Sequence, residues 1–275
     1  MTITVLLLPF VFIFQTNGNK FCKYSKTLSG KASYHMYNAD TPMNSVACQL
    51  PMAFNKKSRE LRVTATNQFE GMTKGLVCGD CIRVRNVESN KSTVVMVIDF
   101  GGAGGLDLCP EAFNNIDTED GLGHSRGHMN VEWDKTNCDD LVGEEKIKYR
   151  YKSGSGKNWY MGVTIIDHKV PLSRSNAVQI SNNEKDANSW YKCKANGANG
   201  YWFCGGHPTF DEDEPFYFRI ESIDGQVLID IVNHVDGVNE GNFIKSVRGV
   251  QFTECGGKNS THPRNCARCK TKDRS

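Results

Sequence analysis

The sequence predicts an all-β protein with two domains. Short apolar or alternating segments recur through most of its 275 residues, whereas the signals of a helix are concentrated at 110–116. A charged stretch at 139–148 separates a first half rich in cysteine and glycine from a second half of different composition. We therefore expect a small barrel of short strands before this stretch and a β-sandwich after it.

In the first half, the strand predictions rest on two kinds of pattern. Apolar and polar side chains alternate at 61–66 and 82–87, as in half-buried strands. Residues 94–98 are an unbroken apolar run, typical of a buried strand, and end at Asp99. A loop with four glycines follows, and Pro110 then marks the start of the expected helix.

The second half has strand-like segments at the spacing of a sandwich, with turn signals such as Asp224-Gly225 between them. These segments are 147–151, 161–166, 177–180, 216–220, 227–232 and 247–252. We expect a signal peptide at 1–18, a barrel at 19–140, a sandwich at 141–253 and a polar, basic, cysteine-containing tail at 254–275.

The amino terminus predicts secretion. Residues 5–14 are nearly all apolar, which suits the core of a signal peptide and is too short to span a bilayer, although no Lys or Arg precedes them. The rest of the sequence has no longer apolar run, so we expect no membrane partner. Two glycosylation sequons, at Asn90 and Asn259, are usable only in a secreted chain.

Eleven cysteines fit an oxidising compartment and a disulfide framework. An odd number leaves one cysteine free or paired with another chain. The Cys78-Gly79-Asp80-Cys81 segment has three readings: a redox pair, half of a zinc site with the carboxy-terminal cysteines, or two cysteines in separate disulfides. The compartment favours the last reading, and we expect no metal or cofactor. The disulfide candidates, of unknown pairing, are Cys22, Cys48, Cys78, Cys81, Cys109, Cys138, Cys193 and Cys204.

Asp99 and Asp107 are the candidate functional carboxylates, since both flank one glycine-rich loop. They would either line a shared groove or only cap backbone amides of that loop. An inverting glycosidase would need an acid and a base roughly 6.5–9.5 Å apart with water between them. The net charge of +2 argues against nucleic acid and favours a neutral partner.

Trp159 and Tyr160 are the candidate binding aromatics, because flat pyranose faces stack on aromatic rings. Adjacent residues of a strand point to opposite faces, so one ring should be buried unless the pair precedes the strand. Core filling is the alternative for both, and also for Trp190, Tyr201 and Trp202. For the first-half histidines, ordinary surface or hydrogen-bonding positions are expected: His35, His124 and His128.

Taken together, these segments resemble the expansin family. Residues 97–113 (VIDFGGAGGLDLCPEAF) are similar to its first-domain motif, an aspartate at a strand end, a glycine-rich loop and L-D-L-[SC]-P-x-A-F. Further similar segments are GKASY at 30–34, CGDC at 78–81, GHMNVEW at 127–133, 154–171 and 213–225. The similarity is colinear from about 30 to 252, and the cysteine-rich tail resembles the branch found in cellulose-making social amoebae.

This resemblance implies a six-stranded double-psi β-barrel followed by an immunoglobulin-like β-sandwich, packed to form one long groove. It also implies loosening of cellulose-containing walls without cutting. Carried over by position, Asp107 is the key acid, Asp99 the second groove aspartate and Ser33 a groove hydroxyl, with Tyr34 beside it. Trp159 and Tyr160 are the aromatic pair of the binding platform.

The sequence departs from the family pattern in three places. Related endoglucanases have a catalytic base just after the position of Tyr34, where this chain has His35 and Met36. Gly101 stands where some relatives have a groove tyrosine. The third platform aromatic has no clear counterpart, and Tyr201 or Trp202 are its stand-ins.

We therefore predict a secreted monomer of the wall or extracellular matrix that binds cellulose or a related β-glucan without hydrolysis. One alternative is an inverting endoglucanase with Asp107 as acid and Asp40 as base. The other is a structural matrix protein that is cross-linked through its cysteine-rich tail.

Overall fold

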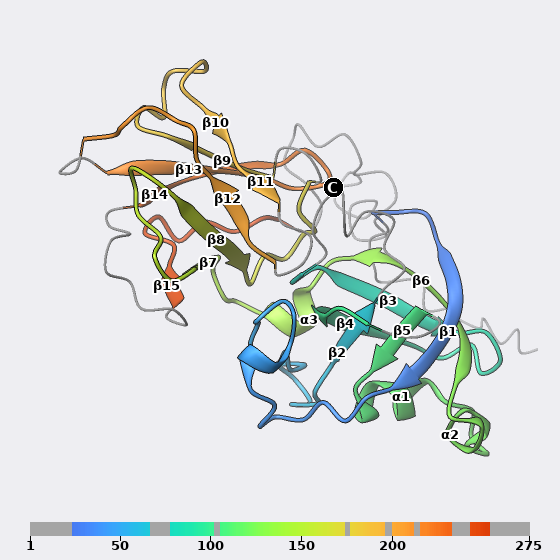
Figure 1. Ribbon diagram of the computed structural model, residues 1–275. Helices are drawn as coiled ribbons and strands as arrows, with labels where there is room; N and C mark the ends of the chain where they lie inside the picture. Colours follow the sequence, from blue (N-terminus) through green and yellow to red (C-terminus); the bar gives the residue numbers. More distant parts are fainter. Residues whose placement is uncertain are drawn as a thin grey trace, which may run out of the picture.

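The computed structural model describes residues 24–66, 78–101, 105–173, 177–195, 200–211, 215–232 and 243–253. The expected signal peptide, Cys22, Asn259 and the tail at 254–275 lie outside these residues. Within them, no helix is long and apolar enough to cross a membrane. The described chain forms a barrel and a pair of sheets, which lie next to each other (Figure 1).

The first domain is a closed, mixed barrel with the strand order β1-β5-β2-β4-β3-β6. Strands β1 and β5 are parallel, as are β2 and β4, and the other neighbours are antiparallel. The expected six-stranded double-psi barrel is thus confirmed. Its strands are β1 (Leu28–Tyr34), β2 (Val63–Thr66), β3 (Cys81–Asn86), β4 (Ser92–Asp99), β5 (Gly105–Leu108) and β6 (Met129–Thr136).

Apolar side chains that point inward fill this barrel. The run ending at Asp99 becomes β4, whose residues from Thr93 to Ile98 are all buried. Trp133 of β6 is the largest of the buried barrel side chains, and Gly105 leaves room for its ring because a Cβ there would lie 3.1 Å from it. The predicted helix is α1 (Pro110–Ile116), while η1 (Met43–Ser45) and α2 (Leu122–Arg126) are short additions.

The second domain consists of two antiparallel sheets, as a sandwich requires. One has the order β10-β9-β13-β14 and the other β11-β12-β8-β7-β15. The first contains β9 (Val178–Ser181), β10 (Tyr191–Lys192), β13 (Phe216–Glu221) and β14 (Val227–Val232). The second contains β7 (Lys148–Tyr151), β8 (Met161–Ile166), β11 (Lys194–Ala195), β12 (Trp202–Cys204) and β15 (Phe243–Lys245).

One strand prediction in this domain is wrong. Residues 247–252 contain no strand, and the final described strand is β15, which precedes them. Gly249, at φ +62°, makes a turn with Ser246, so an extended strand cannot run through this segment. The segment still contributes Phe252 to the core, which explains its apolar pattern.

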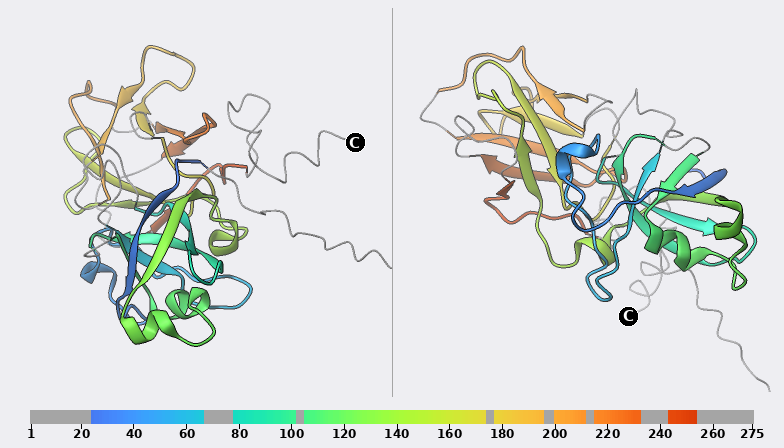
Figure 2. Two further views of the ribbon diagram at one scale, coloured as in Figure 1. Left: turned by 90° about the vertical axis from the view of Figure 1, so that its right-hand side faces the viewer. Right: turned by 60° about the horizontal axis from the view of Figure 1, so that its bottom comes forward.

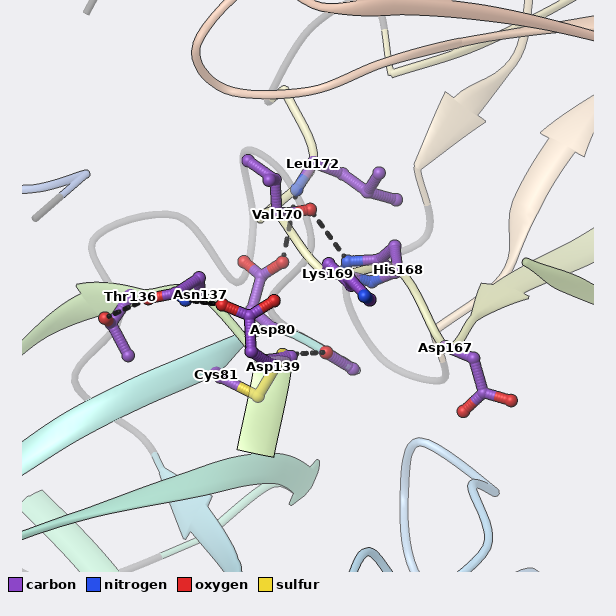
Figure 3. The surroundings of a disulfide bond; sticks show 12 residues. Asp80, Cys81, Thr136, Asn137, Asp139, Asp167, His168, Lys169, Val170 and Leu172 are labelled. Atoms are coloured by element: carbon purple, nitrogen blue, oxygen red, sulfur yellow. Dashed lines mark hydrogen bonds between the residues drawn. A yellow bond between two sulfur atoms is a disulfide. The ribbon is translucent and has the colours of Figure 1, made fainter. Parts of the chain in front are cut away.

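The charged stretch between the domains contains a short helix, α3 (Asp139–Val142), which lies between barrel and sandwich in Figure 1. Polar contacts join the two domains beside it. The Cys138 amide donates to the Lys169 carbonyl at 2.8 Å, and the Leu172 amide donates to Asp80 at 3.3 Å (Figure 3). Asp80 also pairs with the buried Lys135 at 2.6 Å, so its negative charge is compensated. Two further views show the same packing of the two domains (Figure 2).

Three disulfides form among the described cysteines: Cys48–Cys78, Cys81–Cys138 and Cys193–Cys204. The two cysteines of the CGDC segment therefore belong to separate disulfides. The expectation of a disulfide at Cys109 is wrong, because its thiol is free and buried. It contacts the Leu61 carbonyl and the Val63 amide instead, and burial raises the pKa of this thiol to about 11.

The first sequon lies on the surface of the barrel. Asn90 is exposed in the turn between β3 and β4, with φ at +58°. Its side-chain oxygen accepts a hydrogen bond from Arg85 at 2.9 Å. Its exposure supports the prediction that Asn90 can carry a glycan.

Candidate functional site

The barrel brings Ser33, Asp107, Ala65 and Asp99 into one row across four adjacent strands. Ser33 on β1 pairs with Asp107 on β5, Asp107 pairs with Ala65 on β2, and Ala65 pairs with Asp99 on β4. Residues paired directly across neighbouring strands point to the same side of the sheet. The loop that separates Asp99 from Asp107 in sequence therefore leaves them two strands apart in space.

Asp107 keeps one carboxylate oxygen free. Its Oδ1 accepts a short hydrogen bond from the Ser33 hydroxyl, whereas its Oδ2 has no hydrogen bond among the described residues. Both residues are partly exposed. The pair therefore presents an oriented acceptor to any hydroxyl that approaches from solvent.

The carboxylate of Asp99 is largely engaged by the protein itself. Its Oδ1 accepts the Ala47 amide at 2.7 Å and the Phe100 amide at 2.8 Å, and its Oδ2 accepts the Tyr37 hydroxyl at 2.9 Å. These bonds occupy three of about four acceptor positions of a carboxylate. Asp99 thus ties the segment after β1 to the end of β4 and has little capacity left for a ligand.

Both aspartates raise the pKa of the Tyr37 phenol. Burial, followed by the hydrogen bond to Asp99 and the negative charges of Asp99 and Asp107, raises the pKa of this phenol well above its usual value. The hydroxyl therefore stays protonated and continues to donate to Asp99 at physiological pH. His35 lies against the Tyr37 ring at 4.6 Å between ring centroids.

Tyr34 lies at the edge of the row, next to Ser33. Its ring packs edge-on against Phe113 and stacks on the exposed His124, with ring centroids 5.3 Å apart and planes 8° apart. The amide of His124 is held by Asp117, whose carboxylate also caps Gly123. This arrangement leaves Tyr34 partly exposed (37%) at the expected groove.

The second domain presents Trp159 on a turn that precedes β8. Gly156 makes this possible, because a Cβ there would lie 2.1 Å from Cζ2 of the indole. The indole N–H donates to the Gly154 carbonyl at 3.3 Å, which fixes the ring over the turn. One ring face thus packs on backbone, and the side chain remains 63% exposed.

Tyr160 and Phe203 continue this surface. Tyr160 is 36% exposed and stacks on Phe203 with centroids 5.3 Å apart, while the Lys152 ammonium lies 5.9 Å from the Tyr160 ring. Neither Trp159 nor Tyr160 is buried, since both precede the strand rather than alternating within it. We call Trp159, Tyr160 and Phe203 the aromatic platform.

The proposed placement of Trp202 on the platform is wrong. Trp202 and Tyr201 are only 2% and 1% exposed, and the burial pattern of β12 alternates, with Phe203 turned outward. Phe203 therefore provides the third ring, which the sequence analysis missed. No signal in the sequence marks Phe203, because the three residues of β12 are too few to establish an alternation.

The expected base position holds no carboxylate. Met36 and His35 are exposed there, and Asp40 lies in an exposed turn, where its amide donates to Asn38 at 2.9 Å. Gly101 leaves the barrel without a tyrosine at that point, although the preceding Phe100 is 56% exposed. Among the described residues, no cluster of three or more metal-ligating side chains is found.

Residues 26–138 match the Barwin family, and these residues coincide with the barrel. The first domain is therefore similar to the Barwin family.

Two solved structures resemble the whole described arrangement. The apo expansin of Clavibacter michiganensis superimposes with a TM-score of 0.58 at 18% identity, covering 81% of this chain and 96% of that one. An aspartate-to-asparagine mutant of the same expansin, in complex with cellohexaose, gives 0.58 at 18% identity and covers 82% and 98%. The barrel is thus followed by β-sheets as in the two-domain expansin fold.

Proposed function

We propose that this protein is a secreted, expansin-like protein that binds cellulose or a related β-glucan and loosens the surrounding polysaccharide without cutting it. The observation that carries the proposal is the pairing of an exposed aromatic platform with an oriented acceptor on the barrel. The complex of the Clavibacter michiganensis expansin with cellohexaose makes a β-glucan the first ligand to test.

The platform suits a flat, neutral, repeating ligand. Trp159, Tyr160 and Phe203 leave aromatic surface exposed, on which the C–H faces of sugars can stack. Because each ring contributes on the order of 0.5–1.5 kcal/mol, the scale of aromatic pairs, binding is expected to be weak and reversible. Reversible binding is what a protein needs if it is to move along a polysaccharide.

We call the row of Ser33, Asp107, Ala65 and Asp99 the acceptor row. Its carboxylates suit the binding of sugar hydroxyls, in competition with glucan–glucan contacts, rather than hydrolysis. Asp107 has a free oxygen for a sugar hydroxyl, but inversion requires a second carboxylate across the sugar to activate water. Asp99 is in the same row as Asp107 and is engaged by Ala47, Phe100 and Tyr37. We therefore propose that this site binds a glucan without cutting it. The alternative is an endoglucanase in which Asp40 is the catalytic base.

The test of glucan binding is the replacement of Trp159 by alanine. Loss of one stacking ring should weaken cellohexaose binding by about 2- to 13-fold in isothermal titration. Trp190→Ala is the matched control, because it removes an indole from the same domain but outside the platform. Equal affinities of wild type and Trp159→Ala for cellohexaose and for insoluble cellulose would refute the proposal.

A further inference from the structure

Gln49 occupies the junction between the platform and the acceptor row. The Tyr201 ring lies 6.3 Å from the Phe203 ring, and its hydroxyl donates to Gln49 Oε1 at 3.2 Å. Two residues before Gln49, the Ala47 amide donates to Asp99. Contacts therefore run from Phe203 of the platform through Tyr201 to Gln49, and two residues of backbone connect Gln49 to Ala47, which binds Asp99 in the row that contains Asp107.

Arg150 fixes Gln49 from the second domain. Its guanidinium donates to the Gln49 carbonyl at 2.6 Å and to the side-chain Oε1 at 3.0 Å, and it lies 5.9 Å from the centre of the Tyr201 ring. Arg150 is only 4% exposed, and its Nε has no hydrogen-bond partner among the described residues. A buried cation held on neutral acceptors in this way is a costly arrangement that orients them.

These contacts determine the orientation of the Gln49 amide. An arginine can only donate, so the atom that faces it must be the amide oxygen. Arg150 and Tyr201 together engage that oxygen, which leaves the NH₂ group without a partner among the described residues. Gln49 is partly exposed, and its backbone φ of +48° lies in the region that residues other than glycine seldom adopt. The Cys48–Cys78 disulfide, packed next to Gly200, supports this conformation.

We propose that Gln49 is a β-glucan-binding residue at the domain junction, where its oriented NH₂ group donates to a sugar hydroxyl. This inference rests on the proposed function. Gln49 would contact only chains long enough to extend from the platform toward the barrel. It would supply a hydrogen-bond donor between the aromatic platform and the acceptor at Asp107. The site would therefore favour glucan chains that contact both domains.

Gln49→Glu separates this contact from the structural contacts of the same residue. A carboxylate still accepts from Arg150 and Tyr201, but it has no N–H to donate to a sugar. We expect cellohexaose to bind about 2- to 10-fold more weakly, the effect of one lost hydrogen bond, while cellotriose binding and the thermal midpoint are retained. Gln49→Ala should lose the same affinity for cellohexaose and also some stability.

Asn188→Asp is the matched control for added charge, because it makes the same amide-to-acid change in the exposed turn between β9 and β10. Wild-type cellohexaose affinity in Gln49→Glu, alongside a loss in Trp159→Ala, would overturn the assignment of Gln49 alone. Equal losses for cellotriose and cellohexaose would also overturn it. No loss in either Gln49→Glu or Trp159→Ala would instead refute glucan binding by this surface.

Discussion

Asp99 and Asp107 lie on either side of Ala65, yet their carboxylates differ in the acceptor positions that remain free. Asp107 is oriented by one hydroxyl and keeps an oxygen for a ligand, whereas Asp99 binds two backbone amides and a phenol. The sequence suggested both a groove and a loop-capping reading for this pair. Asp99 accepts two backbone amides, as the capping interpretation expects, whereas the groove role of Asp107 stays a prediction that its free oxygen is compatible with.

His168 is a residue whose protonation should affect stability. It is completely buried at the junction, its Nδ1–H donates to the Val170 carbonyl at 3.0 Å, and its Nε2 has no hydrogen-bond partner among the described residues (Figure 3). Burial lowers the pKa of this imidazole, and the positive charge of Lys135 acts in the same direction. The negative charges of Asp80 and Asp167 raise the pKa and offset only part of this effect. The neutral ring therefore fits the site and the charged ring does not.

The sign of the resulting pH dependence follows from this lowered pKa. In the unfolded chain, His168 binds a proton near pH 6.5, whereas in the folded chain it binds the proton only at a lower pH. The contribution of neutral His168 is complete above about pH 6.5 and is lost as the pH falls toward the folded pKa. We expect His168→Asn, which can still donate to Val170, to reduce the loss of stability between pH 7 and pH 5 in urea unfolding. If the free energy of unfolding falls by the same amount between pH 7 and pH 5 in His168→Asn as in the wild type, His168 does not titrate in this way.

At the scale of elements, the turn before β8 determines how the platform is presented. Its bridge between Gly156 and Tyr160 closes a tight loop, and Trp159 lies flat over the glycine. The strand prediction at 161–166 was correct, but alternation within a strand does not apply to the two aromatics that precede it. For this reason the sequence could not show that both rings are exposed.

Gly156→Ala tests this turn. The added methyl would overlap the indole, so Trp159 must leave its position, and cellohexaose binding should weaken about as much as in Trp159→Ala. Gly205→Ala is the matched control, because its Cβ would lie 3.8 Å from the Trp159 carbonyl, an ordinary contact. Titration of both variants, with tryptophan fluorescence as a report on the ring, is the measurement. Wild-type affinity in Gly156→Ala would show that the stacked indole position is not needed.

The remaining elements illustrate which patterns can be read from sequence. Apolar runs and alternation located β2, β3, β4, β7, β8, β9, β13 and β14 to within a few residues. The very short β10, β11 and β12 were missed because two or three residues cannot establish a period. Phe203 was missed for the same reason, and the free thiol of Cys109 depends on distances that spacing does not reveal.

At the scale of the whole molecule, the proposed function requires that the two domains are joined in one fixed arrangement. Arg150 and Tyr201 donate to Gln49, Leu172 donates to Asp80, and Cys138 donates to Lys169, so several buried or part-buried hydrogen bonds join the two domains. Directional hydrogen bonds of this kind favour one relative orientation of the two domains. The motifs in the sequence implied that the domains pack together, but not which residues would join them. Gln49, Arg150 and Tyr201 carry no motif that would have marked them as a group.

The central claim is that the protein loosens a β-glucan by gripping it rather than by cutting it. Extension of a cellulose sheet under constant load, with soluble sugars quantified in the same bath, tests this claim most directly. We predict that the wild-type protein increases extension without releasing sugars, and that Asp107→Asn remains bound but no longer extends the sheet. Sugar release that rises with extension and disappears in Asp40→Ala would contradict the account and identify the protein as an endoglucanase.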